Sequence, residues 1–145
     1  MEQGCLFCRI VAGEVAAATV SEDDRSLAFL DHRPLFPGHC LLIPKAHYET
    51  LTDLPEDLIG PLFSNARWLA IAVEQAMQSD GSFVAINNRV SQSVAHLHIH
   101  VVPRRKKDGL RGFFWPRQKY ESAAEMERVR GILRAAIVRM RSAPR

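Results

Sequence analysis

The segment from Ala95 to Pro103 alternates histidine with aliphatic residues, and this alternation restricts the fold more than any other part of the chain. Successive side chains of a β-strand point to opposite faces, so one face would carry the three histidines His96, His98 and His100. The other face would carry Leu97, Ile99 and Val101, which suit burial against a core. Half of the chain's six histidines lie within the five residues from 96 to 100. The segment therefore predicts a strand with one aliphatic face and one row of imidazoles.

Short apolar runs bounded by turn residues predict further strands at 19–21, 26–30, 40–43 and 82–87. Helical spacing predicts a helix from about Asp53 to Gln78, with Asp53 and Glu56 as its capping pair and Pro61 kinking it or moving its start. Its apolar face comprises Leu58, Phe63, Ala66, Leu69, Ala70, Val73 and Ala76. One or two helical turns are expected within 5–14, and a capping box at 122–125 opens a last helix that runs to about Arg141. The pattern predicts an α+β fold: an antiparallel sheet with one long central helix and a C-terminal helix.

Composition limits the class of protein. Apolar residues make up 47% of the 145 residues and charged residues 24%, as in ordinary globular proteins. No apolar run approaches the roughly 20 residues that a membrane span needs, and the start of the chain does not resemble a secretory signal. With no repeat or linker, we expect a single domain over 1–145, no membrane partner and a cytoplasmic location.

The formal net charge of +3 is concentrated in two regions. Basic residues cluster at 104–107 and at Arg111, and arginines recur from Arg128 to the end. A basic cluster beside the histidine strand suits a polyanionic substrate such as a nucleotide phosphate, although a solvated loop would have the same composition. Nucleic acid is not an expected partner, because basic residues do not interleave with aromatic ones.

A row of histidines fits two chemistries. Three imidazoles can bind a catalytic metal, or one imidazole can attack phosphorus while its neighbours hold phosphate oxygens. Four hydrogen-bonding side chains lie just before the histidine strand: Asn87, Asn88, Gln92 and Ser93. The carboxylate nearest to the strand in sequence is Asp108. This setting favours a nucleophilic histidine over a metal-hydroxide site.

Cys5 and Cys8 have the Cys-x₂-Cys spacing of a metal or redox pair. A closed zinc site needs two more ligands. Reduced thiols without a metal, or a redox pair, are the alternatives. Cys40 stands alone in an apolar strand, where it suits the role of a small buried residue.

The motif His96-Leu97-His98-Ile99-His100-Val101-Val102, with Gln92-Ser93-Val94 before it, resembles the signature of the histidine triad (HIT) family. The likeness continues collinearly over about 5–104, leaving 105–145 as a C-terminal extension and helix. It includes the segments 5–14, 27–31 and 37–47. The cysteine pair matches the zinc-binding, bacterial-type branch.

The resemblance implies a role for each matched residue. His98 would attack the α-phosphorus of a nucleotide, His100 would contact phosphate oxygens and His96 would support them. Gln92 and Ser93 would position the scissile bridge and the leaving group, and Asn87 would hold a ribose or phosphate oxygen. Asp31 would bind the ribose hydroxyls, and an apolar slot for the base would comprise Leu6, Phe7, Ile10 and Phe29. By residue type alone, those four would be ordinary core residues.

The resemblance also implies a structural zinc on Cys5, Cys8, His47 and His96, no organic cofactor and a homodimer. His39 would support the triad or make a loop contact, and His32 would lie on the surface. Family members commonly have glycine before the conserved glutamine, where this chain has Ser91. Glycine there would let the backbone approach the phosphate closely. Phe113–Pro116 would pack on the C-terminal helix, line a dinucleotide site or form a dimer contact.

The expected activity is hydrolysis of nucleoside polyphosphates of the dinucleoside type. A nucleoside phosphoramidase would use the same chemistry. Related nucleotidyl-transfer enzymes carry glutamine at the third triad position, where this chain has His100. A nucleotide-binding regulatory protein and a three-histidine metallohydrolase are the remaining readings.

Overall fold

The computed structural model describes residues 4–111 and 117–143, so the predicted roles of Phe113–Pro116 lie outside the described residues. The chain divides into two compact units, 1–108 and 109–145. The first holds the helix α1 (Leu6–Val11), the helix α2 (Glu56–Met77) and a short 3₁₀ helix (Leu51–Asp53). Its strands are β1 (Thr19–Glu22), β2 (Ser26–Leu30), β3 (Cys40–Pro44), β4 (Gly81–Ala85) and β5 (Ile99–Arg104). The second holds the helix α3 (Ala123–Ser142), capped by Ser122.

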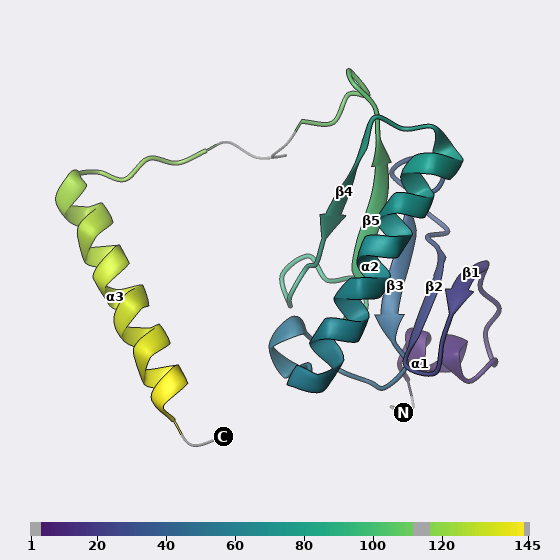
Figure 1. The fold of residues 1–145 in the computed structure, drawn as a ribbon, viewed down its shortest axis with the longest axis horizontal. Helices are drawn as coiled ribbons and strands as arrows, with labels where there is room; N and C mark the ends of the chain where they lie inside the picture. The colour runs from purple at the N-terminus through teal and green to yellow at the C-terminus, as the bar shows by residue number, and fades with distance from the viewer. Residues whose placement is uncertain (1–3, 112–116, 144–145) are drawn as a thin grey trace. The chain divides into compact units, whose positions relative to one another are not determined.

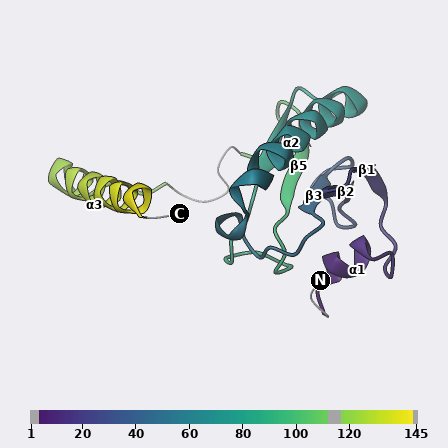
Figure 2. The ribbon, with the colours of Figure 1, turned by 60° about the horizontal axis from the view of Figure 1, so that its bottom comes forward.

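The five strands form one antiparallel sheet in the order β1-β2-β3-β5-β4 (Figure 1). The helices α2 and α1 lie on opposite sides of this sheet (Figure 2). Under α2 the core includes Leu42, Leu97, Ile99 and Val101, and under α1 it includes Phe7, Phe29, Leu41 and Ile43. The predicted α+β class and antiparallel sheet are therefore confirmed.

The start of α2 differs from the prediction. Asp53 accepts hydrogen bonds from the backbone N and the Oγ1 of Thr50 (3.0 and 2.6 Å), so it caps the 3₁₀ turn and not the long helix. The helix α2 begins after Pro55 and continues through Pro61. Its buried residues are Leu62, Ala66, Leu69 and Val73, whereas Phe63 is 40% exposed and Ala76 is exposed.

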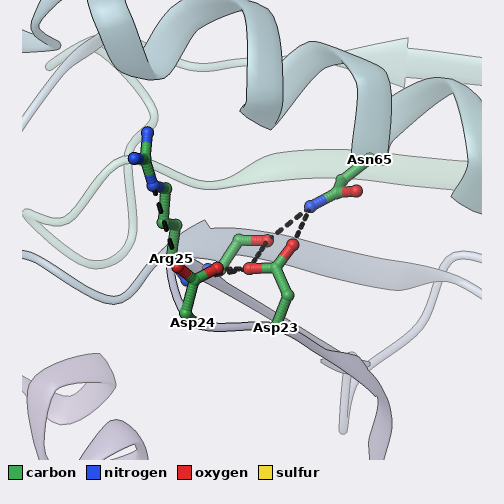
Figure 3. A network of polar contacts seen from close by, with 5 residues as sticks. Asp23, Asp24, Arg25 and Asn65 are labelled. Carbon is green, nitrogen blue, oxygen red and sulfur yellow. Dashed lines mark hydrogen bonds and ion pairs between the residues drawn. The ribbon is translucent and has the colours of Figure 1, made fainter.

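A polar network ties α2 to the turn between β1 and β2 (Figure 3). The Asp23 carboxylate accepts the backbone N–H groups of Arg25 and Ser26 at 2.8 and 2.7 Å. Asn65 of α2 donates to Asp23 Oδ2 and to the Ser26 hydroxyl. The hydrogen bond from the Arg25 backbone is the largest of the contacts that lower the pKa of Asp23, so the carboxylate is ionised near neutral pH.

Candidate active site and metal cluster

The histidine row lies on the sheet face that α1 covers. Leu97, Ile99 and Val101 are fully buried under α2, which confirms the predicted alternation. The strand itself is shorter than predicted, because His96 and His98 precede the first residue of β5. His100 pairs with Leu41 of the neighbouring strand β3. The sheet register thus directs the aliphatic residues to one core and the imidazoles to the other side.

His98 is 2% exposed, and one of its ring nitrogens is committed to the backbone. Its Nδ1 lies 2.7 Å from the carbonyl oxygen of His96. Because a carbonyl oxygen can only accept, Nδ1 must carry the proton of the neutral ring. The lone pair therefore resides on Nε2, which is the nitrogen that would act as the nucleophile.

His39 fixes the tautomer of His100. The backbone N–H of Leu35 donates to His39 Nδ1 (3.1 Å), so the proton of neutral His39 lies on Nε2. That nitrogen donates to His100 Nδ1 at 2.9 Å. His100 consequently carries its own proton on Nε2, where it can donate to a phosphate oxygen.

His100 is held neutral. Burial, followed by the nearby His98 and His39, lowers the pKa of His100 to about 4, against the weaker effect of Asp31. Burial also lowers the pKa of His39, and Asp31 opposes that shift. At neutral pH, His100 therefore offers an N–H donor and not a positive charge.

Asp31 lies directly after β2, beside this pair. Its Oδ1 accepts the backbone N–H of Arg33 at 2.9 Å, and its Oδ2 is 3.7 Å from His39 Nε2. The donor atoms of Asp31, His39 and His100 are close enough to hold a metal ion. His39 has no lone pair to offer it, since Nδ1 accepts from Leu35 and Nε2 carries the proton. We interpret the chain of contacts from the Leu35 backbone through His39 to His100 as a hydrogen-bond relay; the predicted ribose contact of Asp31 stays a prediction.

The loop before the triad is closed by Gln92. Its Nε2 donates to the carbonyl oxygen of Glu49, and its Oε1 accepts the backbone N–H of Arg89, both at 2.6 Å. The side chain of Asn88 accepts from the Leu51 backbone, while Asn87 and Ser93 are exposed. The substrate contacts expected of Gln92, Ser93 and Asn87 stay predictions.

Two residues of this loop have left-handed backbone conformations. Arg89 has φ +65° and Ser91 has φ +59°. Ser91 stands where family members commonly have glycine, the residue that adopts this conformation at no steric cost. The loop therefore keeps a glycine-like backbone without the glycine.

The predicted base slot separates into buried and accessible residues. Phe7 and Phe29 are each 4% exposed, and their rings pack edge to face with centroids 5.5 Å apart. Leu6 is 39% exposed, and Ile10 is partly buried. Leu6 and Ile10 can thus present surface to a base, whereas Phe7 and Phe29 pack as core residues.

The four predicted zinc ligands converge. Their ligand atoms all lie within 4.8 Å of one another: Cys5, Cys8, His47 and His96. The His96 Nδ1 is 3.5 Å from Cys5 Sγ and 3.6 Å from Cys8 Sγ, and His47 Nδ1 is 3.3 Å from Cys8 Sγ. Tetrahedral zinc, with bonds of about 2.3 Å to sulfur and about 2.0 Å to nitrogen, separates such atoms by ~3.5 Å.

The tautomer of His96 also suits metal binding. Its Nε2 lies 2.8 Å from the carbonyl oxygen of Pro44, so Nε2 carries the proton and the Nδ1 lone pair faces the thiols. The residues present therefore fit a zinc ion. Cys40 faces the core under α2, and the His32 side chain is 84% exposed, as predicted for both.

The basic run after β5 is partly used within the protein. Arg104 pairs with Asp108 at 2.6 Å, and Arg105 donates to the carbonyl oxygen of Met77. Lys106 and Lys107 are exposed. Asp108 thus offsets the charge of Arg104, and the run carries less net positive charge than its four basic residues alone indicate.

Residues 12–107 match the family model of the HIT domain. The chain belongs to the HIT family. It is 37% identical over 112 residues to adenylylsulfatase HINT3 of Arabidopsis thaliana, a match that covers 76% of this chain and 57% of that protein. It is 36% identical over 122 residues to the adenosine 5'-monophosphoramidase HNT1 of Saccharomyces cerevisiae, covering 82% of this chain and 74% of that protein.

Among solved HIT structures, a zinc-bound histidine triad protein of Mycobacterium smegmatis matches with a TM-score of 0.70 and 36% identity. The match covers 97% of this chain and 98% of that one. The Arabidopsis and yeast relatives both carry the names of hydrolases, and this HIT protein is an enzyme of the hydrolase class. None of the helices over the described residues combines the length and hydropathy that crossing a bilayer requires.

Proposed function

We propose that this HIT protein hydrolyses nucleoside polyphosphates of the dinucleoside type through a nucleotidyl-histidine at His98. The hydrogen bond from His98 Nδ1 to the His96 carbonyl carries the proposal, because it leaves the Nε2 lone pair for attack. In the first step, Nε2 bonds to the α-phosphorus and the leaving group departs with its electron pair. In the second step, water displaces the histidine and releases the nucleotide.

The surroundings of His98 suit both displacements. The His96 carbonyl stabilises the positive charge that the imidazole acquires when Nε2 bonds to phosphorus. The His100 Nε2–H would donate to a phosphate oxygen, and Asp31 would accept hydrogen bonds from the ribose. Leu6 and Ile10 would contact the base. A zinc ion on Cys5, Cys8, His47 and His96 would supply structural cross-linking of α1 to the sheet.

A phosphoramidase is the second candidate. The yeast relative is named for that activity, and it is 36% identical to this chain. The same nucleophile would release an amine instead of a nucleoside phosphate. Because Asp108 already pairs with Arg104, the basic run after β5 has less uncompensated charge for a long polyphosphate, which favours this smaller leaving group.

The test compares wild type with His98→Ala on diadenosine tetraphosphate and on an adenosine phosphoramidate. We expect the variant to lose at least about 10³-fold in kcat while nucleotide binding persists, because only the covalent step is removed. His32→Ala is the matched control, since that side chain is 84% exposed. Substantial turnover by His98→Ala would refute the nucleophile, and the better wild-type substrate would identify the branch.

We also propose a homodimer and a cytoplasmic location. The resemblance to the family supports the dimer, and β4 is an edge strand of the sheet in which Val84 is 46% exposed. The three cysteines, Cys5, Cys8 and Cys40, are unbridged, which suits a reducing compartment. Light scattering of the purified chain at several concentrations would give the mass that decides the first point.

A further inference from the structure

We propose that the Cys5–Cys8–His47–His96 cluster, when it binds zinc, holds the His98 ring in the tautomer and orientation needed for attack. The inference rests on the proposed role of His98 as the nucleophile. It assigns the cluster a second task besides cross-linking, namely the positioning of a side chain that is not itself a ligand.

The first link is residue 96, which serves both groups. The His96 ring directs Nδ1 at the thiols, and its Nε2 donates to the Pro44 carbonyl (2.8 Å) in β3. The carbonyl of the same residue accepts the Nδ1 proton of His98 at 2.7 Å. A metal bond at one end and a strand carbonyl at the other would fix this residue. Its backbone oxygen is then fixed as well.

The second link is Phe7, which lies between the two cysteines in α1. Its ring packs perpendicular to the His98 ring, with centroids 5.2 Å apart and an angle of 87° between the planes. It also contacts the rings of His96 and Phe29. The helix α1 has six residues, too few for stability by itself. Cys5 and Cys8 lie on either side of Phe7 in the sequence, so a metal bound to both would keep the Phe7 ring in contact with the His98 ring.

The tautomer of the third triad histidine does not depend on the cluster. The tautomer of His100 is set by His39, and that of His39 by the Leu35 backbone, both in the segment that joins β2 to β3. Although the His98 and His100 rings are in contact, with centroids 5.0 Å apart, loss of zinc should therefore loosen His98 and leave the tautomer of His100 unchanged. This difference separates a positioning effect from a general loss of structure.

The matched variants are Cys5→Ser and Cys40→Ala. Cys5 is the N-cap of α1, where its side chain accepts the Cys8 backbone N–H; serine is a preferred N-cap but not a usual zinc ligand. Cys5→Ser thus removes a ligand and keeps the cap. Cys40 is a buried cysteine of β3 in the core under α2, away from the cluster, so Cys40→Ala controls for the loss of a thiol.

The experiment uses the full chain, loaded with Zn²⁺ or freed of it. Metal content is measured directly, and two-bond ¹H–¹⁵N imidazole spectra report which nitrogen of each histidine is protonated. We expect one Nδ1–H tautomer for His98 in zinc-loaded wild type and in Cys40→Ala. In metal-free wild type and in Cys5→Ser, we expect a mixture of tautomers at His98, an unchanged His100, and a fall in kcat of about 10–100-fold with a smaller change in KM.

A His98 that keeps its single Nδ1–H tautomer in folded, metal-free protein would overturn the proposal. If removal of zinc or Cys5→Ser also alters His100, the structure as a whole has changed; His47→Gln, which removes a ligand on another element, then decides by the same two signals. Should His47→Gln alter both histidines as well, selective positioning is wrong. Tautomer changes in a protein inactive on both substrates would support the linkage while refuting the proposed function.

Discussion

The left-handed backbone at Ser91 permits a test of stability that is independent of activity. Ser91 has φ +59°, a conformation that costs a side-chain-bearing residue roughly 1–2 kcal/mol relative to glycine. Ser91→Gly removes this cost but gives the unfolded chain more freedom, which opposes the gain by about 0.5–1 kcal/mol. The net change in the free energy of unfolding is therefore small, and a reference substitution is needed.

Ser93→Gly supplies that reference. Ser93 belongs to the same loop, is also exposed, and has no left-handed backbone. The same atoms are removed in both variants, and the unfolded-state term cancels in the comparison. Ser91→Gly should exceed Ser93→Gly by about 1–2 kcal/mol in the free energy of unfolding. At about 4 °C per kcal/mol for a unit of this size, the Tm values should differ by roughly 4–8 °C.

The assay is thermal unfolding of the zinc-loaded protein, repeated in urea to obtain the free energy of unfolding. Equal changes in the free energy of unfolding for the two substitutions would refute the reasoning. They would mean that the left-handed backbone at Ser91 carries no cost that glycine removes. Arg89, with φ +65°, allows an independent repeat, in which Arg89→Gly is compared with a glycine substitution at an ordinary loop position.

Three further predictions concern Gly38, His39 and His100. Gly38→Ala should cost at least about 2 kcal/mol by urea unfolding, because Gly38 has φ +95° and an added Cβ would lie 2.6 Å from Met77 Cγ; an unchanged midpoint would contradict this. His39→Phe should lower kcat about tenfold or more by removing the donor to His100, and His39→Gln, which retains an N–H donor, should lose less; equal losses would argue against the relay. Folding lowers the pKa of His100 from about 6.5, its ordinary value in the unfolded chain, to about 4. Between these two values the unfolded chain therefore binds more protons at this residue than the folded protein does. Stability should thus be full above pH ~6.5 and decline as pH falls toward ~4, which Tm measured across this range would show.

Local patterns predicted the elements well where period and burial agree. The alternation at 95–103 predicted which side chains face the core, since a strand surrounded by other strands allows only one register. The start of α2 was predicted wrongly because Asp53 and Glu56 mimic a capping box. Thr50, three residues before Asp53, forms the actual box around the 3₁₀ turn. Sequence spacing alone does not say which of two overlapping pairs closes.

Long-range contacts were harder to predict. The relay from Leu35 through His39 to His100 joins a turn to a distant strand, and only the pairing of β3 with β5 brings them together. The signal in the sequence was limited to a histidine, His39, directly after the Pro37-Gly38 turn and before the strand β3. The ligand set at 5, 8, 47 and 96 came from the family resemblance, because three separate elements supply it.

The pairing of β5 with a neighbour on each side has a consequence for chain length. Deleting or inserting one residue between 97 and 100 would exchange the two faces downstream, turning imidazoles into the aliphatic core and aliphatic side chains toward the substrate. Length changes in even numbers would preserve the faces but shift the position of each ring along the strand. If the triad is transferred to another protein, an even spacing between its histidines must be kept, because only that spacing places all three on one face of a strand.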